Sequence, residues 1–281
     1  MSSLDWFVFE VFGASVVAGF IGALGGLGGG ILIVPLLTVG FGVDIRLAIG
    51  ASIISVIATS SGAGAAYVRD HLTNIRVAML LELATTVGAV TGAYLATRLK
   101  SDILFVIFGL TLLVSVVPLM FRLGEELPAD VPDDALADKL RLHGEYPDAH
   151  LGRVVDYRVT GVRLGFPMMY AAGVVSGLLG IGSGVLKVLS LDTAMRIPMK
   201  VSSATSNFMI GVTAAASAGI YFWRGDVVPL IAAPVALGVL LGATLGARVL
   251  VRVSNRTVRY VFVPIVVVIS IEMFLRGLSV T

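Results

Sequence analysis

The stretch Gly19-Phe-Ile-Gly-Ala-Leu-Gly-Gly-Leu-Gly-Gly-Gly-Ile-Leu32 decides how this chain folds, because the chain repeats it. The second copy is Gly173-Val-Val-Ser-Gly-Leu-Leu-Gly-Ile-Gly-Ser-Gly-Val-Leu186, and it lies 154 residues further on. Each glycine inside a helix costs about 1 kcal/mol relative to alanine, so neither glycine cluster is expected to continue a regular helix. Each copy therefore predicts a helix that breaks and resumes at a short apolar segment.

Further matches in the same order extend the repeat. Tyr67 matches Tyr221 at the same offset of 154 residues. Ala51-Ser52 is paired with Ala204-Thr205 at an offset of 153, which implies a small insertion. Ordered matches of this kind indicate a fused duplication, an architecture that many secondary transporters share. Parallel and inverted halves both remain open, since the number of crossings in each half decides between them.

The composition is that of a membrane protein. The chain has 281 residues, of which 57% are hydrophobic and 14% are charged. Soluble domains carry about 25% charged residues, and lipid-facing helices explain such a deficit. The absence of cysteine excludes disulfides and thiolate metal sites. The net charge of +2 is too small to suggest nucleic acid as a partner.

Hydropathy divides the chain into apolar stretches, and a span needs about 20 apolar residues. They run over 6–24, 31–41, 47–68, 77–97, 103–121, 164–180, 185–191, 198–223, 228–250 and 258–275. The stretches 31–41 and 185–191 are too short to cross alone, so we expect the second limbs of broken or re-entrant helices there. The predicted fold is an all-α polytopic membrane protein of about eight spans in two pseudo-symmetric halves.

Three segments follow from this pattern. The first transmembrane repeat covers 1–121, a polar and acidic linker covers 122–163, and the second repeat covers 164–281. We expect the linker to be a solvent-exposed connector with a short helix near 133–143. Lys and Arg divide almost evenly between the two nominal sides, so they do not orient the protein at this point.

The glycine clusters are the first candidate site. Backbone groups of an unwound segment cannot be satisfied by lipid, so a break survives only inside the protein or beside a wet cavity. We therefore assign Gly26, Gly28, Gly29 and Gly30 to a substrate-lining break, with Gly182, Ser183 and Gly184 as its second copy. Free N–H groups at the following half-helix would favour an anion. Close helix packing through glycine is the alternative.

Lys187 is the candidate cation of the site, and it stands where the first half has Ile33. An ammonium inside a span costs about 2.5–3.5 kcal/mol on insertion scales, so its presence calls for a function. One turn beyond the glycine break it would point toward the same anion. The alternative is a lysine whose side chain reaches out to the membrane interface.

Hydroxyl and amide groups form the third candidate cluster. The stretch Lys200-Val-Ser-Ser-Ala-Thr-Ser-Asn207 supplies Ser203, Thr205 and Asn207, and the first half supplies Ser52. Helix capping and interhelical hydrogen bonding would use the same residues. Glu82 is the candidate for proton coupling, because intramembrane carboxylates are few. The pairs Gly88/Gly92 and Gly242/Gly246 are assigned to helix packing.

The chain resembles the TauE/SafE sulfite-exporter family over nearly its whole length. The residues that carry the resemblance are GGLGGG-ILIVP (25–35), GIGSG-VLKVL (180–189) and KVSSATSNFMIGVTAAASAG (200–219). The resemblance implies transport of small anions such as sulfite, sulfonates or related organosulfur compounds across a prokaryotic cytoplasmic membrane, driven by the proton gradient. Departures from the family pattern are Ser183 for glycine, Leu189 for a frequent proline and Ala51 for a frequent threonine. The two half-sites are thus unequal.

Two other functions compete with the secondary transporter. A passive anion channel would use the same polar groups, and an intramembrane serine hydrolase would need Ser183 with Lys187, because no histidine lies within a span. We expect no enzyme activity and no cofactor, since metal ligands, nucleotide-binding loops and haem motifs are not recognisable. The expected partners are a small anionic solute and the lipid bilayer, with a homodimer and the direction of transport left open.

Overall fold

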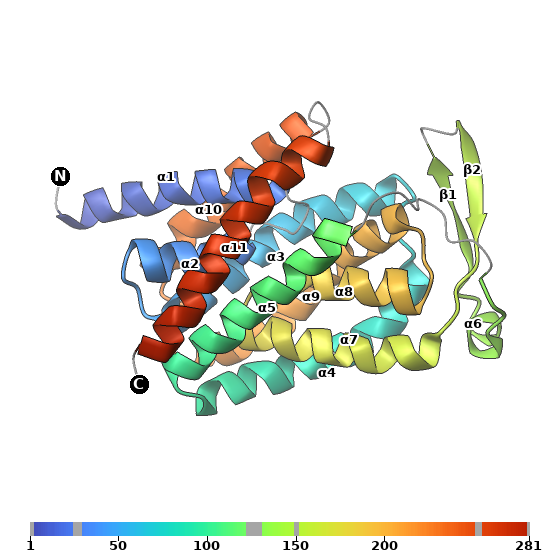
Figure 1. Ribbon diagram of the computed structural model, residues 1–281, viewed down its shortest axis with the longest axis horizontal. Helices are drawn as coiled ribbons and strands as arrows, with labels where there is room; N and C mark the ends of the chain where they lie inside the picture. The colour runs from blue at the N-terminus through green and yellow to red at the C-terminus, as the bar shows by residue number, and fades with distance from the viewer. Residues whose placement is uncertain (1–2, 25–29, 122–130, 149–151, 251–254, 280–281) are drawn as a thin grey trace.

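The computed structural model describes residues 3–24, 30–121, 131–148, 152–250 and 255–279, and these residues are almost entirely helical (Figure 1). The elements are α1 (Ser3–Leu24), α2 (Gly30–Pro35), the π-helix η1 (Leu36–Gly40), α3 (Ile45–Arg69), α4 (Ile75–Arg98), α5 (Ser101–Phe121), α6 (Ala135–Lys139), β1 (Gly144–Asp148), β2 (Arg153–Tyr157), α7 (Val162–Leu179), α8 (Gly184–Leu189), the π-helix η2 (Ser190–Ala194), α9 (Met199–Trp223), α10 (Pro229–Leu250) and α11 (Asn255–Ser279). The predicted all-α class is confirmed.

The helices repeat at an offset of 154 residues. The bounds of α8, η2 and α9 each lie 154 residues after those of α2, η1 and α3. No insertion separates the two copies here, so the pairing of Ser52 with Thr205 is wrong. Ser52 corresponds to Ser206 instead.

The two halves are inverted. Equivalent helices α3 and α9 run antiparallel, because Gly64 approaches Phe208 while Ser60 approaches Gly211. Equivalent helices α5 and α11 also run antiparallel: Gly109 lies against Ser270 and Phe274, whereas Gly277 lies against Asp102 and Val106. Both of these pairs of equivalent helices therefore run in opposite directions, as an inverted repeat requires.

A helical hairpin in each half produces this inversion. Phe7 near the start of α1 stacks edge-on against Phe41 just after η1, with ring centroids 5.9 Å apart. In the second half the N–H of Thr160, before α7, donates to the carbonyl of Met195, just after η2, at 3.2 Å. In each half the first long helix and the short helices after it thus form a hairpin that returns to its starting end. Three further helices follow, so each half finishes at the opposite end of the bundle.

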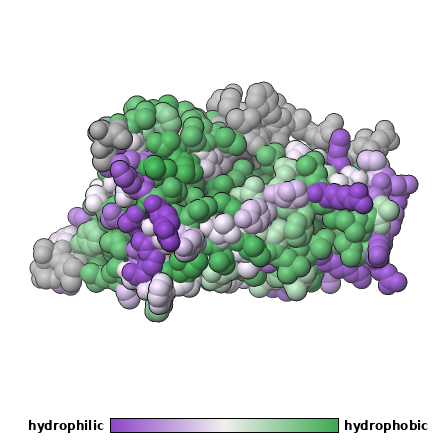
Figure 2. All heavy atoms as spheres, turned by 90° about the horizontal axis from the view of Figure 1, so that it is seen from below, coloured by the Kyte–Doolittle hydropathy of each residue, from purple (hydrophilic) through white to green (hydrophobic). Residues whose placement is uncertain are grey.

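Five helices of the described residues are long and apolar enough to cross a membrane, and they cover Asp5–Ala23, Ile45–Arg69, Ile75–Arg98, Val162–Leu179 and Pro229–Gly246. Gly30–Gly40 and Ser101–Ser115 are shorter apolar helices. Figure 2 shows hydrophobic residues over the middle of one face and hydrophilic residues gathered toward its two ends. The protein is a multi-pass membrane protein, and the count of about eight spans stays a prediction.

Glycine lets the helices pack closely, as predicted for the Gly88/Gly92 and Gly242/Gly246 pairs. A Cβ on Gly92 would collide with the carbonyl of Val174 on α7, and one on Gly242 would collide with the carbonyl of Val16 on α1. The pairs α4–α7 and α1–α10 therefore join a helix of one half to a helix of the other. The halves are interlocked rather than placed side by side.

The linker folds more extensively than expected. It contains the predicted short helix, α6, and in addition an antiparallel hairpin in which Glu145 pairs with Asp156 and Tyr146 with Val155. Tyr146 and Tyr157 are buried, and they pack with the membrane-helix residues Val77, Leu81, Met169, Met195 and Val201. The hairpin therefore covers one end of the helical bundle (Figure 1).

Asn74 fastens the hairpin to the bundle. Its Nδ2 donates to the hydroxyl oxygen of Tyr157 at 2.7 Å and to the carbonyl of Leu142 at 2.8 Å. Its Oδ1 accepts from the N–H of Val77 and caps α4. Burial raises the pKa of Tyr157 to about 12, although the hydrogen bond from Asn74 opposes the shift.

Candidate functional site

The second helix interruption is present as predicted. Gly180, Gly182 and Ser183 adopt left-handed backbone conformations with φ of 68°, 72° and 46°, and they separate α7 from α8. Such a conformation suits glycine and is strained for serine. The first interruption, with Gly26, Gly28 and Gly29, lies outside the described residues, and Gly30 is the first residue of α2.

Ser52 joins the two interruptions. Its hydroxyl is fully buried and lies 3.1 Å from the carbonyl oxygen of Gly30 and 2.9 Å from that of Gly180. The two carbonyls belong to different halves, and each marks the edge of a helix break. A buried carbonyl without a donor is costly, so Ser52 stabilises both breaks at once. The structure thus brings Ser52, Gly30 and the second break together.

Ser206 is the equivalent residue in the second half. Its hydroxyl donates to the carbonyl of Gly184 at 3.1 Å, and the sequence separation of 22 residues is the same as between Ser52 and Gly30. The predicted residue at this place was Thr205, one position earlier. A strict offset of 154 residues over the whole repeat would have identified Ser206.

Lys187 lies in the interior and is fully buried, which rules out a side chain that reaches the membrane interface. Its Nζ donates to Thr213 Oγ1 at 2.6 Å. Thr213 Oγ1 in turn lies 2.7 Å from Glu82 Oε1 and 2.7 Å from the carbonyl of Met209. The helices α8, α9 and α4 each contribute one member of this chain, so the predicted cation and the predicted coupling carboxylate belong to one buried network.

Glu82 retains unused hydrogen-bonding capacity in this network. Its Oε1 accepts from Thr86 at 3.1 Å and from Thr213. Its Oε2 is buried and has no hydrogen-bond partner among the described residues. Thr213 was not predicted from the sequence, because nothing in the sequence distinguishes it from other threonines of the apolar helices. Its role becomes visible only where α4, α8 and α9 meet in space.

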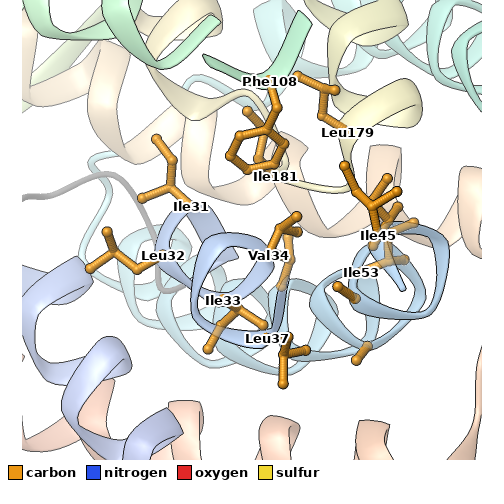
Figure 3. Packing of buried hydrophobic residues seen from close by; sticks show 14 of the residues in the cluster. Ile31, Leu32, Ile33, Val34, Leu37, Ile45, Ile53, Phe108, Leu179 and Ile181 are labelled. Carbon is orange, nitrogen blue, oxygen red and sulfur yellow. The ribbon is translucent and has the colours of Figure 1, made fainter. Parts of the chain in front are cut away.

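The charged network spans both halves, and the symmetry-related positions carry no such charges. At the offset of 154 residues Lys187 corresponds to Ile33 and Glu82 corresponds to Ala236. Ile33 is fully buried, and Figure 3 shows it with other apolar side chains of α2, α3, α5 and the second interruption. The predicted inequality of the two half-sites is therefore visible as one polar and one apolar half.

Ser183 lies one helical turn before Lys187, at the N-terminal end of α8. Its side chain is 4% exposed, and its hydroxyl has no hydrogen-bond partner among the described residues. The carbonyl of Ser183 accepts from the N–H of Lys187 at 3.1 Å, one helical turn away. The ammonium of Lys187 bonds to Thr213, and the hydroxyl of Ser183 bonds neither to Lys187 nor to Thr213. The structure therefore does not form the Ser–Lys pair that a hydrolase would need.

The remaining predicted residues hold helices in place. Thr205 accepts from the backbone N–H of Asn74 at 3.0 Å, which anchors the start of α4. Asn207 Nδ2 donates to the carbonyl of Ser203 at 3.0 Å within α9. These contacts do not connect the three residues to Lys187. No group of three or more metal-ligating side chains occurs in the part of the chain that the structure describes.

Inverted, interlocked halves with broken helices at their centre and a buried ionic network define a membrane transporter. The model of the family Sulfite exporter TauE/SafE matches residues 11–273, and the chain belongs to that family.

Related proteins carry the same general description. The chain is 27% identical to the probable membrane transporter protein YunE of Bacillus subtilis over 94% of its own length and 96% of that protein. It is 25% identical to the probable membrane transporter protein YdhB of the same organism, over 82% of its own length and 84% of that protein. No solved structure matches the chain. The family and these relatives are membrane transporters, not enzymes.

Proposed function

We propose that the protein is a secondary transporter of a small oxyanion, namely sulfite, a sulfonate or a related organosulfur anion, in the cytoplasmic membrane of a prokaryotic cell. The observation that carries the proposal is the fully buried ammonium of Lys187, one turn beyond a helix interruption. A buried charge without a role is expensive in a membrane, and such residues are characteristic of solute pathways. The proton gradient is the proposed driving force.

The donors around Lys187 suit an oxyanion. A sulfonate or sulfite spreads its charge over three oxygens, which are best matched by one cation and several hydrogen-bond donors. The ammonium has three donor protons, and Thr213 is its one partner among the described residues. The hydroxyl of Ser183 supplies a further donor. Gly26, Gly28, Gly29, Gly30, Gly182 and Gly184 would allow the anion to approach the backbone.

Burial favours a carrier over a channel. Lys187, Ser183, Ser52 and Ser206 are all buried, so the described residues close the site from solvent. A carrier needs such an occluded state, because it exposes its site to one side of the membrane at a time. A passive channel needs a continuous path instead.

The test is transport by purified protein in proteoliposomes, with sulfite, thiosulfate, sulfate and methanesulfonate as solutes. Wild type should carry at least one of them, and Lys187→Met should abolish the flux. Lys100→Met changes an exposed lysine and is the matched control. Thermal shift of wild type with each solute reports binding independently, since a ligand of the native state raises its stability. Transport at the wild-type rate by Lys187→Met would remove Lys187 from the mechanism.

Lys187→Met leaves the Glu82 carboxylate unpaired, so folding needs its own control. The double variant Glu82→Gln/Lys187→Met removes both charges and should restore a monodisperse, folded protein. If the double variant folds and is also inactive, loss of the ammonium and not misfolding explains the loss of flux.

A further inference from the structure

We propose that Glu82, Thr213 and Lys187 form an electroneutral exchange unit, in which Glu82 takes up one proton for each monovalent anion that binds to Lys187. The inference rests on the proposed function and gives it a stoichiometry. Its basis is the hydrogen-bonded chain from the ammonium through the threonine hydroxyl to the carboxylate, which joins the two halves of the protein.

The unloaded unit is neutral. Lys187 carries one positive charge and Glu82 one negative charge, and Thr213 relays the hydrogen bond between them at 2.6 and 2.7 Å. Lys187 is fully buried, and Glu82 is half-buried with its Oε2 shielded from solvent, so the carboxylate compensates the charge of the buried ammonium. An anion that binds to Lys187 adds a negative charge to this closed space. The unit then has an excess charge unless a proton enters with the anion.

Glu82 is positioned to take up that proton. Its Oε2 is buried and has no partner among the described residues, whereas Oε1 is occupied by Thr213 and Thr86. A proton from hydronium in the bulk solution forms an O–H bond to Oε2 while one O–H bond of hydronium breaks, which leaves a neutral carboxylic acid and water. The ammonium then keeps its full charge for the anion, and the loaded unit is neutral again. A dianion such as sulfate would leave a net negative charge and is excluded.

Other charged groups are poorly placed to serve this role. On the elements packed against the unit they are Arg46 and Arg69 on α3, Arg76 and Arg98 on α4, Asp102 on α5, Arg163 on α7, Asp192 on η2 and Lys200 on α9. All of them lie near helix ends, and none is buried. Of the tyrosines on these helices, Tyr94 and Tyr170 are exposed, and Tyr221 donates to the carbonyl of Gly177. Buried Asp226 follows α9 and faces Arg224 at 3.4 Å, whereas Glu82 is the carboxylate that Thr213 connects to Lys187.

The pseudo-symmetry supports a single coupling unit. The equivalents of Lys187 and Glu82 are Ile33 and Ala236, so neither charge is present at the symmetry-related pair of positions. The described residues therefore hold one such pair, formed where α8 of the second half meets α4 of the first. A single pair fits one proton and one anion per cycle.

The experiment uses methanesulfonate, which stays monoanionic across the pH range of the assay, so that only the protein titrates. Because one proton binds with each anion, wild-type affinity should fall about tenfold per pH unit once the pH is too high for that proton to be bound beforehand. Binding in a weakly buffered solution should take up one proton per anion. Glu82→Gln mimics the protonated acid, and its affinity should not depend on pH. Glu10→Gln alters an exposed carboxylate on α1 and should behave as wild type.

Thr213→Val tests the relay without removing a charge. The variant should still bind methanesulfonate. The pH at which the affinity begins to fall should shift, because the threonine hydroxyl no longer connects the Lys187 ammonium to the Glu82 carboxylate. Wild-type flux should follow a pH gradient and not an imposed membrane potential. A pH-dependent affinity in Glu82→Gln, the absence of proton uptake by wild type, or flux driven by potential would overturn the exchange unit while leaving anion transport intact. Failure of wild type to bind any tested anion would overturn both proposals.

Discussion

Ser52 and Ser206 are equivalent residues of two inverted halves, and each donates its hydroxyl to the carbonyl of the glycine 22 residues before it. This pair fixes the start of α2 and the start of α8 in the same way. Ser52 also reaches Gly180 of the other half, so it holds both breaks in one place.

Ser52→Ala should destabilise the protein by about 1–3 kcal/mol, because the buried carbonyls of Gly30 and Gly180 lose the one hydroxyl proton that they share. The expected readout is a lower melting temperature in detergent and slower transport. Ser61→Ala on the same helix is the control, since Ser61 is exposed and bonds only to the carbonyl of Ile57 in its own helix. Equal melting temperatures for Ser52→Ala and Ser61→Ala would contradict a joining role for Ser52.

Gly177→Ala should destabilise the pairing of α7 with α4. The added methyl group would collide with the backbone of Ala89, and overpacking of this kind costs about 1–3 kcal/mol. Gly219→Ala is the control, because nothing lies within 4 Å of a Cβ at that position. Thermal unfolding should separate the two variants, and a stable Gly177→Ala protein would show that the helices can move apart without cost.

Alkaline pH should loosen the linker hairpin through Tyr157. Burial raises the pKa of Tyr157 to about 12 in the folded protein, against about 10 for an ordinary tyrosine. Below pH 10 the phenol is neutral in both the folded and unfolded states. Stability is lost as pH rises from about 10 to about 12, because only the unfolded state ionises freely in that window.

The measurement is the melting temperature of wild type and Tyr157→Phe as a function of pH. The wild type should lose roughly 2–3 kcal/mol more than Tyr157→Phe between pH 10 and 12. Tyr170→Phe changes an exposed tyrosine and should follow the wild type. Parallel curves for all three proteins would show that Tyr157 does not control the alkaline loss of stability.

The linker should face the cytoplasm. Lysine and arginine favour the cytoplasmic side, and the linker carries Lys139, Arg141, Arg153, Arg158 and Arg163. Both termini lie at the other end of the bundle, because α1 begins and α11 ends there. The protein contains no cysteine, so single substitutions can be labelled without background.

Cysteine at exposed Glu145 should resist a membrane-impermeant maleimide in intact cells, and cysteine at Ser101, at the other end of the bundle, should react. Permeabilised cells supply the control in which both react. The reverse pattern in intact cells would place the linker outside.

Much of the architecture could be predicted from the sequence because glycine and hydropathy act locally. The broken helix before Lys187 follows from the conformational preference of Gly180 and Gly182. The network of Lys187 with Glu82 could not be predicted, because it requires the relative rotation of α4, α8 and α9. The hairpin was missed because charged residues dominate the linker composition, whereas its buried face depends on Tyr146 and Tyr157.

The inverted arrangement also bears on how the chain arose. Equivalent helices of the two halves run in opposite directions and pack against each other, as α3 does against α9 and α5 against α11. An ancestral half that entered the bilayer in both orientations could therefore have assembled as an antiparallel pair of separate chains. Fusion through the linker would then have locked one member of the pair in each direction.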